Sequence, residues 1–353
     1  MKAIKDLPAG AFEHPALLYR DEESYLAGTV PFVRAAIAAN EPVAVAVPGP
    51  KATHIASALG LAARRVTWID MRQAGRNPAR IIAAVLRDFA DSHGDRRVRI
   101  IGEPVWAGRG DSEYPACAQH EALINAAFAG RGATILCPYD VSALSAAVVA
   151  DAERTHPVLV ENGIRRESAS YAPDEVVSRY NLPLEVPPGA VSMQFDLGSL
   201  GKARHFAVAG GSEAGLAGDV LDDVALAVGE LTANSVQHGG GTGLLSVWRE
   251  DGQLVIQVAD AGRLADPLAG RRPATGHQRG GRGLLLVNHV ADLVRTHVSE
   301  RSTTTRACFR LSQDGTPGVH TDRSGSGAYL PRNPMSPGTA VRKNSSLWPP
   351  GAV

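Results

Sequence analysis

Two patterns of apolar residues divide the chain into two parts. Between residues 16 and 160, short β-branched runs alternate with longer stretches that are rich in alanine. The short runs are typical of buried strands, and the longer stretches carry apolar residues at helical spacing. The expected strands lie at 42–48, 65–70, 97–103 and 133–140, and the expected helices lie at 24–40, 54–63, 78–94 and 117–130. Because strands and helices alternate, this part predicts an α/β domain with a mostly parallel sheet that helices cover on both faces.

The pattern changes after residue 190, where several strands follow one another with short connections. The expected strands lie at 191–197, 243–251, 252–262, 292–300 and 304–311, and the expected helices lie at 198–210, at 217–239 and from 283 onwards. A turn at Glu250-Asp251-Gly252 predicts that the second and third of these strands form a hairpin. Strands that pair locally, with their helices grouped together, predict an α+β sandwich of two layers.

Proline and glycine mark the ends of these two parts. The stretch NLPLEVPPGA, which contains three prolines, predicts a linker between them. After Leu311 the sequence is dense in proline, glycine and serine, which predicts a disordered tail. The expected organisation is therefore a first domain at 1–165, a linker at 166–190, a second domain at 191–312 and a tail at 313–353.

Composition and charge exclude several classes of protein. Lysine plus arginine and aspartate plus glutamate each number 36, and this balance argues against a nucleic-acid binder with a broad basic face. The three cysteines are too few and too scattered for a disulfide framework or a zinc cluster. The sequence shows neither the apolar core of a signal peptide nor a run of ~18 apolar residues that could span a membrane. We therefore expect a cytoplasmic protein.

The helix expected at 217–239 carries polar residues on one face. Glu230 and Asn234 are four residues apart in VALAVGELTANSVQHGG, and His238 continues the same face. The amide oxygen of Asn234 suits a hard cation that keeps most of its waters, such as Mg²⁺. Glu230, one turn earlier, could polarise a water or a hydroxyl beside that metal. The alternative is a polar last turn of the helix, which the following glycines end.

Asp260 follows the strand LVIQVA directly and precedes Ala261-Gly262. A carboxylate at a strand end can accept a hydrogen bond from an exocyclic amine, and Gly262 would let a flat ring approach the backbone. The alternative is a simple turn in which the aspartate side chain bonds to its own backbone.

The segment GRGLLLVNHVAD opens a helix with little besides glycine before it. Gly281 and Gly283 leave main-chain N–H groups uncovered at the helix start, which attracts phosphate through free donors and the helix dipole. Arg282 or Arg279 could add positive charge, and Leu284 completes the G-x-G-L pattern. This segment, the acid at Asp260 and the Glu230 helix follow one another within a span that fits one domain.

This order of motifs resembles the GHKL ATPase superfamily, and most closely the small anti-sigma factor serine kinases, from about Val191 to Leu311. GELTANSVQHG resembles the N-box of the family, VADAG its adenine box, GGRGLLLVNHVAD its phosphate-lid box and STTTRACFRL its closing strand. The resemblance implies a two-layer Bergerat-type fold, with ATP and Mg²⁺ as cofactors. It implies the following roles: Glu230 as general base, Asn234 on Mg²⁺, Asp260 on the adenine amino group, Gly262 in the adenine pocket, Gly281 and Gly283 around the phosphates, Thr304 on the adenine side, and His238, Arg282 and Leu284 as further residues of the nucleotide site. One departure is that Arg263-Leu264 stands where the family often has a second glycine.

The resemblance implies a regulatory serine/threonine kinase. Such a protein binds a sigma factor and phosphorylates a serine on the antagonist of that sigma factor, and its relatives are often homodimers. Two alternatives stay open. The first is a sensor histidine kinase that uses His120, although no proline follows this histidine and no helical hairpin precedes the second domain. The second is a non-catalytic module in which ATP only gates the affinity for a partner.

The first domain contains fewer chemical signals. VAVPGPK at 45–51 lacks the G-x-x-x-x-G-K-[ST] spacing of a phosphate loop. His14, His120, Cys137 and His156 lack the spacing of a metal site, so we expect buried or capping roles for them. GEPVWAGRG at 102–110 follows a strand of the parallel sheet, where ligands usually bind.

From about Glu13 to Val160 the chain resembles the MEDS sensory domain of methanogen and methylotroph regulators, in segments such as GRNPARII, GEPVWAGR, QHEALINAAF and LCPYD. The resemblance implies a degenerate RecA-like layout and a domain that senses small molecules or partners. The residues that we expect to contact such a ligand are His14, Trp106, Arg109, His120 and Asp140.

Overall fold

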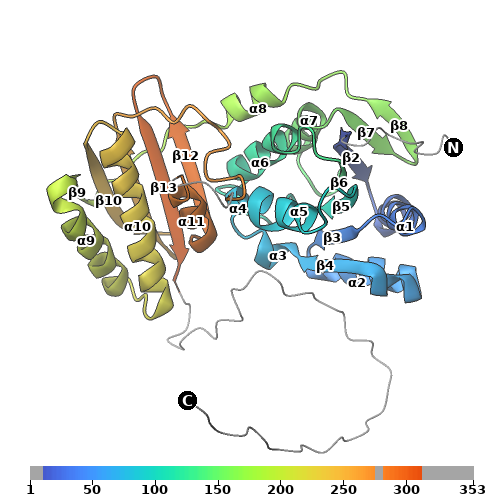
Figure 1. The fold of residues 1–353 in the computed structure, drawn as a ribbon, viewed down its shortest axis with the longest axis horizontal. Coiled ribbons are helices and arrows are strands. Elements are labelled where there is room, and N and C mark those ends of the chain that lie inside the picture. Colours follow the sequence, from blue (N-terminus) through green and yellow to red (C-terminus); the bar gives the residue numbers. More distant parts are fainter. Residues whose placement is uncertain (1–10, 275–280, 312–353) are drawn as a thin grey trace, which may run out of the picture.

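The computed structural model describes residues 11–274 and 281–311, which form two domains that lie side by side (Figure 1). The predicted disordered tail at 313–353 lies outside these residues, and so does Arg279. Among the described helices, none combines the length and the apolar character that a membrane span requires.

The first domain is built on an eight-stranded sheet within the described residues. Its strands are β1 (Phe12–Glu13), β2 (Pro15–Tyr19), β3 (Val43–Val47), β4 (Val66–Asp70), β5 (Val98–Gly102), β6 (Ala133–Asp140), β7 (Val158–Glu161) and β8 (Ile164–Glu167). The order across the sheet is β4-β3-β5-β6-β2-β7-β8, with β1 beside β6. All neighbours are parallel except β7 and β8, which form an antiparallel pair at the edge. The predicted parallel sheet is confirmed.

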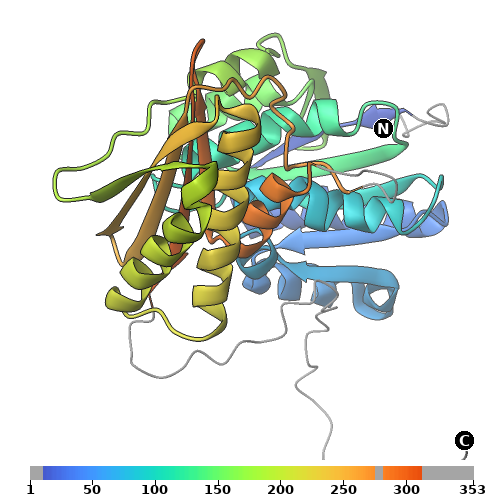
Figure 2. The same cartoon turned by 60° about the vertical axis from the view of Figure 1, so that its left-hand side comes forward.

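Helices cover both faces of this sheet (Figures 1 and 2). They are α1 (Glu22–Ala38), α2 (Gly49–Leu59), α3 (Met71–Ala74), α4 (Pro78–Ile81), α5 (Asp88–Asp91), α6 (Tyr114–Ala127), α7 (Ala146–Thr155) and α8 (Pro173–Arg179). A 3₁₀ stretch follows α2 at Gly60–Arg65, and a π-helical stretch at Ile82–Arg87 joins α4 to α5. Ala44 and Ala46 of β3 pack in one apolar core, whereas Val43, Val45 and Val47 pack in another. Both cores exclude water, which explains why the strand sequences are apolar without alternation.

The sequence predicts a linker over the whole stretch 166–190, but only part of this stretch is a linker. Residues of β8 and the whole of α8 belong to the first domain, because Val176 is fully buried against Ala118 and Ala122 of α6. Only the part after α8 connects the domains, and it runs along the second sheet, where the Leu184 carbonyl accepts a hydrogen bond from Gln257 Nε2 at 3.0 Å. The helix escaped prediction because it is short and buries few side chains.

The second domain has two layers (Figure 2). Its strands are β9 (Val191–Asp196), β10 (Thr242–Glu250), β11 (Gln253–Asp260), β12 (Leu293–Val298) and β13 (Thr303–Arg310). Its helices are α9 (Leu200–Glu213), α10 (Asp219–His238) and α11 (Gly283–Val290), with a 3₁₀ turn at Leu197–Ser199. The sheet order is β12-β13-β11-β10-β9, every pair is antiparallel, and the helices cover one face. The predicted α+β sandwich is confirmed, including the hairpin, whose turn residues Asp251 and Gly252 both have positive φ.

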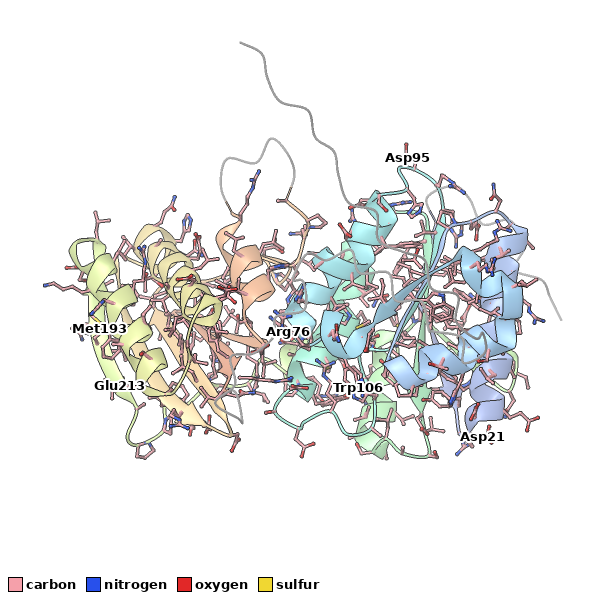
Figure 3. The ribbon with its side chains drawn as sticks, turned by 90° about the horizontal axis from the view of Figure 1, so that it is seen from below. Asp21, Arg76, Asp95, Trp106, Met193 and Glu213 are labelled. Atoms are coloured by element: carbon pink, nitrogen blue, oxygen red, sulfur yellow. The ribbon has the colours of Figure 1, made fainter. Side chains whose placement is uncertain are left out.

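The two domains meet where α4 lies beside α11 and β12 (Figure 1). Asn77, fully buried, donates from Nδ2 to the Asn288 carbonyl at 2.8 Å, and its Oδ1 accepts from the Val294 amide at 3.2 Å. Beside it, Arg76 forms an ion pair with Asp292 at 3.1 Å, and Figure 3 shows this arginine at the boundary between the domains. Because a buried amide replaces water for two backbone groups of the other domain, this contact fixes how the domains sit together.

Candidate functional site

A cavity of about 410 Å³ lies in the second domain, between α10, the loop after β11 and the start of α11. Its walls bring together seven residues that the sequence predicts for a nucleotide site: Asn234, His238, Asp260, Gly262, Gly281, Gly283 and Leu284. They come from three separate stretches of the chain, so the cavity exists only in the folded domain. Apolar side chains, among them Leu231, Val258 and Leu268, form the rest of the wall.

Asp260 is held in one orientation at the end of β11. Its Oδ2 accepts a hydrogen bond from the Ser235 hydroxyl at 2.6 Å, and its Oδ1 accepts from the Gly262 amide at 2.8 Å. The hydrogen bond from the Gly262 amide closes the local turn that the sequence analysis gives as the alternative role of Asp260. The structure therefore contains both the turn and the cavity. Each carboxylate oxygen keeps capacity for a further donor from the cavity.

Gly262 and Gly239 are close-packed beneath this carboxylate. A Cβ on Gly262 would lie 2.6 Å from the His238 carbonyl oxygen, and a Cβ on Gly239 would overlap Asp260 itself. Both positions therefore require glycine for the loop after β11 to lie against the end of α10.

Gly283 links the start of α11 to the polar face of α10. A Cβ at this position would lie 2.5 Å from Glu230 Oε2 and 3.1 Å from Asn234 Nδ2. Glu230 is not among the described residues that line the cavity, but its carboxylate lies against Gly283, which does line it. The two predicted motifs are thus in direct contact.

The beginning of α11 is open at the cavity. Gly281 has a φ of +77°, a conformation that glycine adopts without strain. Arg282 is the N-cap residue, and its side chain makes no capping hydrogen bond to the first turn. The first amides of α11 lie at the helix end where the dipole favours negative charge, and Arg282 does not cap them.

Thr304, which the sequence predicts on the adenine side, is not among the described residues that line the cavity. Side chains alternate along β13, and Thr303 and Thr305 line the cavity instead. The Thr303 hydroxyl donates to the Gly262 carbonyl at 2.9 Å and accepts from the Leu264 amide at 3.0 Å. Ala307 and Phe309 of β13 are apolar and face the helices. Because alternate residues of a strand share a face, these two residues indicate that Thr303 lies on the same face.

The loop after Gly262 connects the cavity to the first domain. Arg263 and Leu264, which replace the second glycine of the family, line the cavity. Further along, Leu268 lines the cavity and also packs in an apolar core of the first domain. Arg271 is buried, its pKa is lowered to about 10 by that burial, and its charge contributes to lowering the pKa of His120. One wall of the cavity therefore rests on the first domain.

Three of the predicted sensory residues have structural partners. Arg109 lies over the Trp106 ring, with its guanidinium carbon 4.5 Å from the ring centroid, and donates to the carbonyls of Pro104 and Gly75 at 2.9 and 2.8 Å. Asp140 accepts from the Ser142 amide at 3.0 Å and so shapes the turn after β6. These contacts hold loops together, and none of these residues lines the cavity of the second domain.

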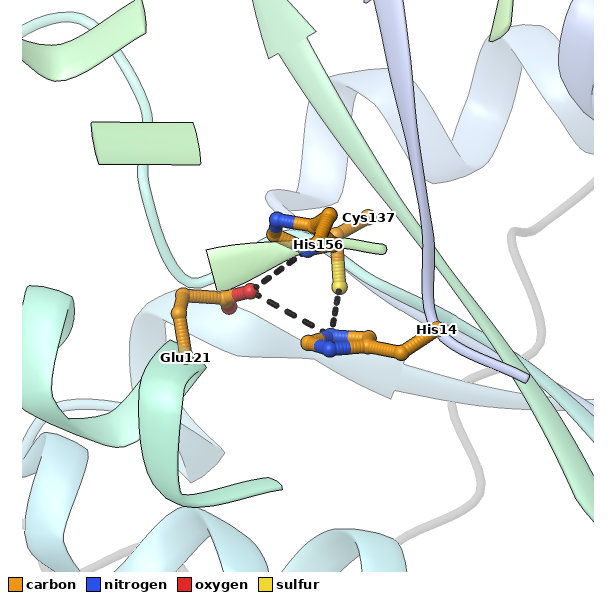
Figure 4. Close-up of side chains that lie close together, drawn as sticks. All are labelled: His14, Glu121, Cys137 and His156. Atoms are coloured by element: carbon orange, nitrogen blue, oxygen red, sulfur yellow. Dashed lines mark hydrogen bonds and ion pairs between the residues drawn. The ribbon is translucent and has the colours of Figure 1, made fainter. Parts of the chain in front are cut away.

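The other two predicted sensory residues, His14 and His120, are buried, as the sequence predicts. Burial is the main reason why the pKa of His14 falls to about 4 and that of His120 to about 3. His14 meets Glu121, Cys137 and His156 in the interior of the first domain (Figure 4). Sequence spacing missed this cluster because its members lie far apart along the chain.

A second buried group at the ends of β2, β3 and β5 also escaped prediction. The Lys51 ammonium donates to the Glu103 carboxylate and to the Tyr19 hydroxyl, and the Tyr25 hydroxyl donates to Glu103 at 3.3 Å. Burial raises the pKa of Glu103 to about 7. Lys51, whose segment lacks the spacing of a phosphate loop, is thus paired with the carboxylate of Glu103.

The fold and the cavity define the second domain as an ATPase domain of the GHKL type. Residues 193–309 match the family model described as a histidine kinase-like ATPase domain. Residues 13–157 match the model described as MEDS, the MEthanogen/methylotroph, DcmR Sensory domain. The chain therefore combines a sensory domain with an ATPase domain, which is the organisation of a regulatory ATP-binding protein. A search of curated proteins found no match to this chain.

Proposed function

We propose that this protein is a serine/threonine kinase of the anti-sigma factor type. In this proposal it binds a sigma factor and phosphorylates a serine on the antagonist protein, and the sensory domain modulates the transfer. The observation that carries the proposal is the convergence of Asn234, Asp260 and Gly283 on one cavity of an ATPase-type domain.

The cavity suits ATP at both of its ends. The fixed Asp260 carboxylate can accept a hydrogen bond from the adenine amino group, and apolar side chains such as Val258 and Leu268 can cover the ring. At the other end, the uncapped amides of α11 suit the phosphates. The close packing of Gly262 and Gly283 supports this fit, since a side chain at either position would disturb the walls.

Two residues of α10 would serve the transfer. Asn234 lines the cavity with its amide and would hold Mg²⁺, which neutralises phosphate charge when bound. Glu230 would accept the proton of the incoming serine hydroxyl. Phosphoryl transfer depends mainly on positioning and charge neutralisation, so the site needs no covalent intermediate on the protein.

The contact between the domains supports regulation. Leu268 lies in the wall of the cavity and in the core of the first domain at the same time. Asn77 of the first domain binds the backbone of α11 and β12, and α11 begins at the cavity. A rearrangement of the first domain would therefore change the cavity wall and the position of the phosphate-binding helix.

Burial argues against the histidine kinase alternative. His120 is 1% exposed, so its ring has no access to a nucleotide without local unfolding. The non-catalytic alternative is favoured by one observation, the replacement of the second glycine by Arg263-Leu264 in the loop of the cavity.

The test compares Asn234→Ala with Gln237→Ala, which changes an exposed residue of the same helix. Calorimetry with Mg²⁺ and ATP is followed by capture of partners from native lysate with and without ATP, and by a search for new phosphoserine on them. We expect wild type and Gln237→Ala to bind ATP and transfer phosphate, and Asn234→Ala to lose both. Intact binding by Asn234→Ala would contradict the assigned site, and binding without transfer would favour the non-catalytic module.

A further inference from the structure

We propose that the first domain binds one divalent transition metal ion, zinc by its ligand chemistry, through His14, Glu121, Cys137 and His156. One ligand atom from each residue lies within 4.8 Å of all the others (Figure 4). The residues come from the β1–β2 junction, α6, β6 and the end of α7, so they meet only in the folded domain. All four are buried, with at most 1% of each residue exposed.

The separations between the ligand atoms suit a tetrahedral ion. His14 Nε2 lies 3.3 Å from Cys137 Sγ and 3.5 Å from Glu121 Oε2, and His156 Nε2 lies 3.1 Å from the same carboxylate oxygen. Zinc bonds of about 2.0–2.3 Å place tetrahedral ligand atoms roughly 3.3–3.8 Å apart. Only small side-chain movements would bring the four atoms to bonding distance.

Hydrogen bonds on the outer side of the His156 ring show which nitrogen faces the centre. Its Nδ1 lies 2.8 Å from the Ala152 carbonyl oxygen, which can only accept, so Nδ1 carries the hydrogen. In the neutral ring, Nε2 then directs a lone pair toward Glu121. The Glu121 carboxylate has no hydrogen bond of standard geometry among the described residues, and its close contacts are those with His14 Nε2 and His156 Nε2.

His14 is oriented in the same way by Asn125. The Asn125 amide nitrogen donates to the Thr155 carbonyl at 2.8 Å, which turns the amide oxygen toward His14 Nδ1 at 3.2 Å. His14 Nδ1 is therefore the donor, and its Nε2 directs a lone pair toward Cys137 and Glu121. Metal-bound histidines characteristically donate their other ring nitrogen to such an oxygen.

With Cys137 and Glu121 ionised, four acceptor atoms converge in the buried interior, where either shared protons or one cation must lie between them. A thiolate from Cys137 and the carboxylate of Glu121 supply two negative charges, which match a divalent ion. Nitrogen and sulfur ligands select zinc-like ions over Mg²⁺ or Ca²⁺. Because four protein ligands complete a tetrahedron, the site is closed, and the ion would tie α6 and α7 to the sheet rather than activate water.

The competing explanation is a cluster that shares protons and holds no metal. The experiment measures metal content of the purified full chain by mass spectrometry and then exchanges the metal for Co²⁺, whose tetrahedral thiolate complexes have distinctive visible and near-ultraviolet bands. We expect about one zinc ion per chain and a cobalt–thiolate band in the wild type. Less than about a tenth of an ion of any transition metal, with no tetrahedral cobalt spectrum, would overturn the proposal.

Two cysteine variants localise the ion. Cys137→Ser removes a proposed ligand, whereas Cys117→Ser changes another buried free cysteine of the same domain. We expect the thiolate band to disappear in Cys137→Ser and to persist in Cys117→Ser. A band that survives in Cys137→Ser would also overturn the proposal. If Cys137→Ser does not fold, the metal content and the cobalt spectrum of the wild type decide.

Discussion

Gly283, the first residue of α11, lies directly against the carboxylate of Glu230 on α10, since a Cβ on the glycine would be 2.5 Å from Glu230 Oε2. The start of α11, whose amides face the cavity, thus contacts Glu230, the residue proposed as general base. A side chain at this position has to displace the ends of the Glu230 and Asn234 side chains.

The first prediction concerns this contact. We expect Gly283→Ala to weaken ATP binding by about tenfold or more, because overpacking costs about 1–3 kcal/mol and each tenfold in affinity corresponds to about 1.4 kcal/mol. Calorimetry measures the change. Gly201→Ala is the matched control, since a Cβ at Gly201 would meet no atom within 4 Å. Equal ATP affinity in the two variants would show that α11 does not depend on this close approach.

The second prediction distinguishes the two faces of β13. Thr303→Val removes the hydroxyl that bonds to Gly262 and Leu264, which leaves polar backbone groups unsatisfied at a cost of about 1–3 kcal/mol. We expect its ATP affinity to fall roughly tenfold, because the loop that carries Gly262 loosens. Thr304→Val, on the opposite face, should bind ATP as the wild type does. The reverse order of effects would restore Thr304 as the nucleotide contact.

The third prediction concerns the wall shared by the domains. Leu268→Ala should lower the free energy of unfolding by about 2–4 kcal/mol, because it leaves a cavity in the core of the first domain, and it should also weaken ATP binding. Thermal unfolding with and without ATP measures both effects. Leu197→Ala, at a residue that is 73% exposed, should change stability by less than about 0.5 kcal/mol. If Leu268→Ala is as stable as Leu197→Ala, the loop that carries Leu268 does not pack against the first domain.

The fourth prediction concerns pH and Glu103. Burial raises the pKa of this carboxyl from its usual 4.5 to about 7, so the folded state binds the proton more tightly than the unfolded state. The stabilisation from the protonated form is fully present below the unfolded pKa and is lost as pH rises through about 7, with a slope of up to about 1.4 kcal/mol per pH unit. Tyr19 and Tyr25, which bond to Glu103, have raised pKa values and stay neutral in this range.

Glu103→Gln should remove this contribution. Denaturant unfolding at about pH 5 and about pH 8 should give a smaller difference in the free energy of unfolding for Glu103→Gln than for the wild type. Glu167→Gln, at an exposed position of β8, should keep the wild-type difference. If the wild type and Glu103→Gln lose the same free energy between these pH values, the titration of Glu103 does not control stability.

The periodicity of the sequence predicted the layers of both domains, but it missed β1, β2, β7 and β8 of the first sheet. The apolar run of β3 predicts a strand buried on two faces, and the structure places its alternate residues in two cores. The turn at Asp251-Gly252 predicts the hairpin of β10 and β11. The short helix α8 was missed because Val176 is its single fully buried residue, which is too little to form a helical pattern.

The sequence motifs identified seven of the residues that line the cavity, among them Asn234 on α10 and the glycines at the start of α11. They named Thr304, whereas Thr303 and Thr305 line the cavity, because the side of β13 on which a residue lies depends on which face of the sheet the helices cover. Sequence spacing alone could not find the cluster of His14, Glu121, Cys137 and His156. Local order along the chain sets helices, strands and turns, whereas the packing of distant elements around a common core decides which side chains share a space, and only tertiary structure contains that information.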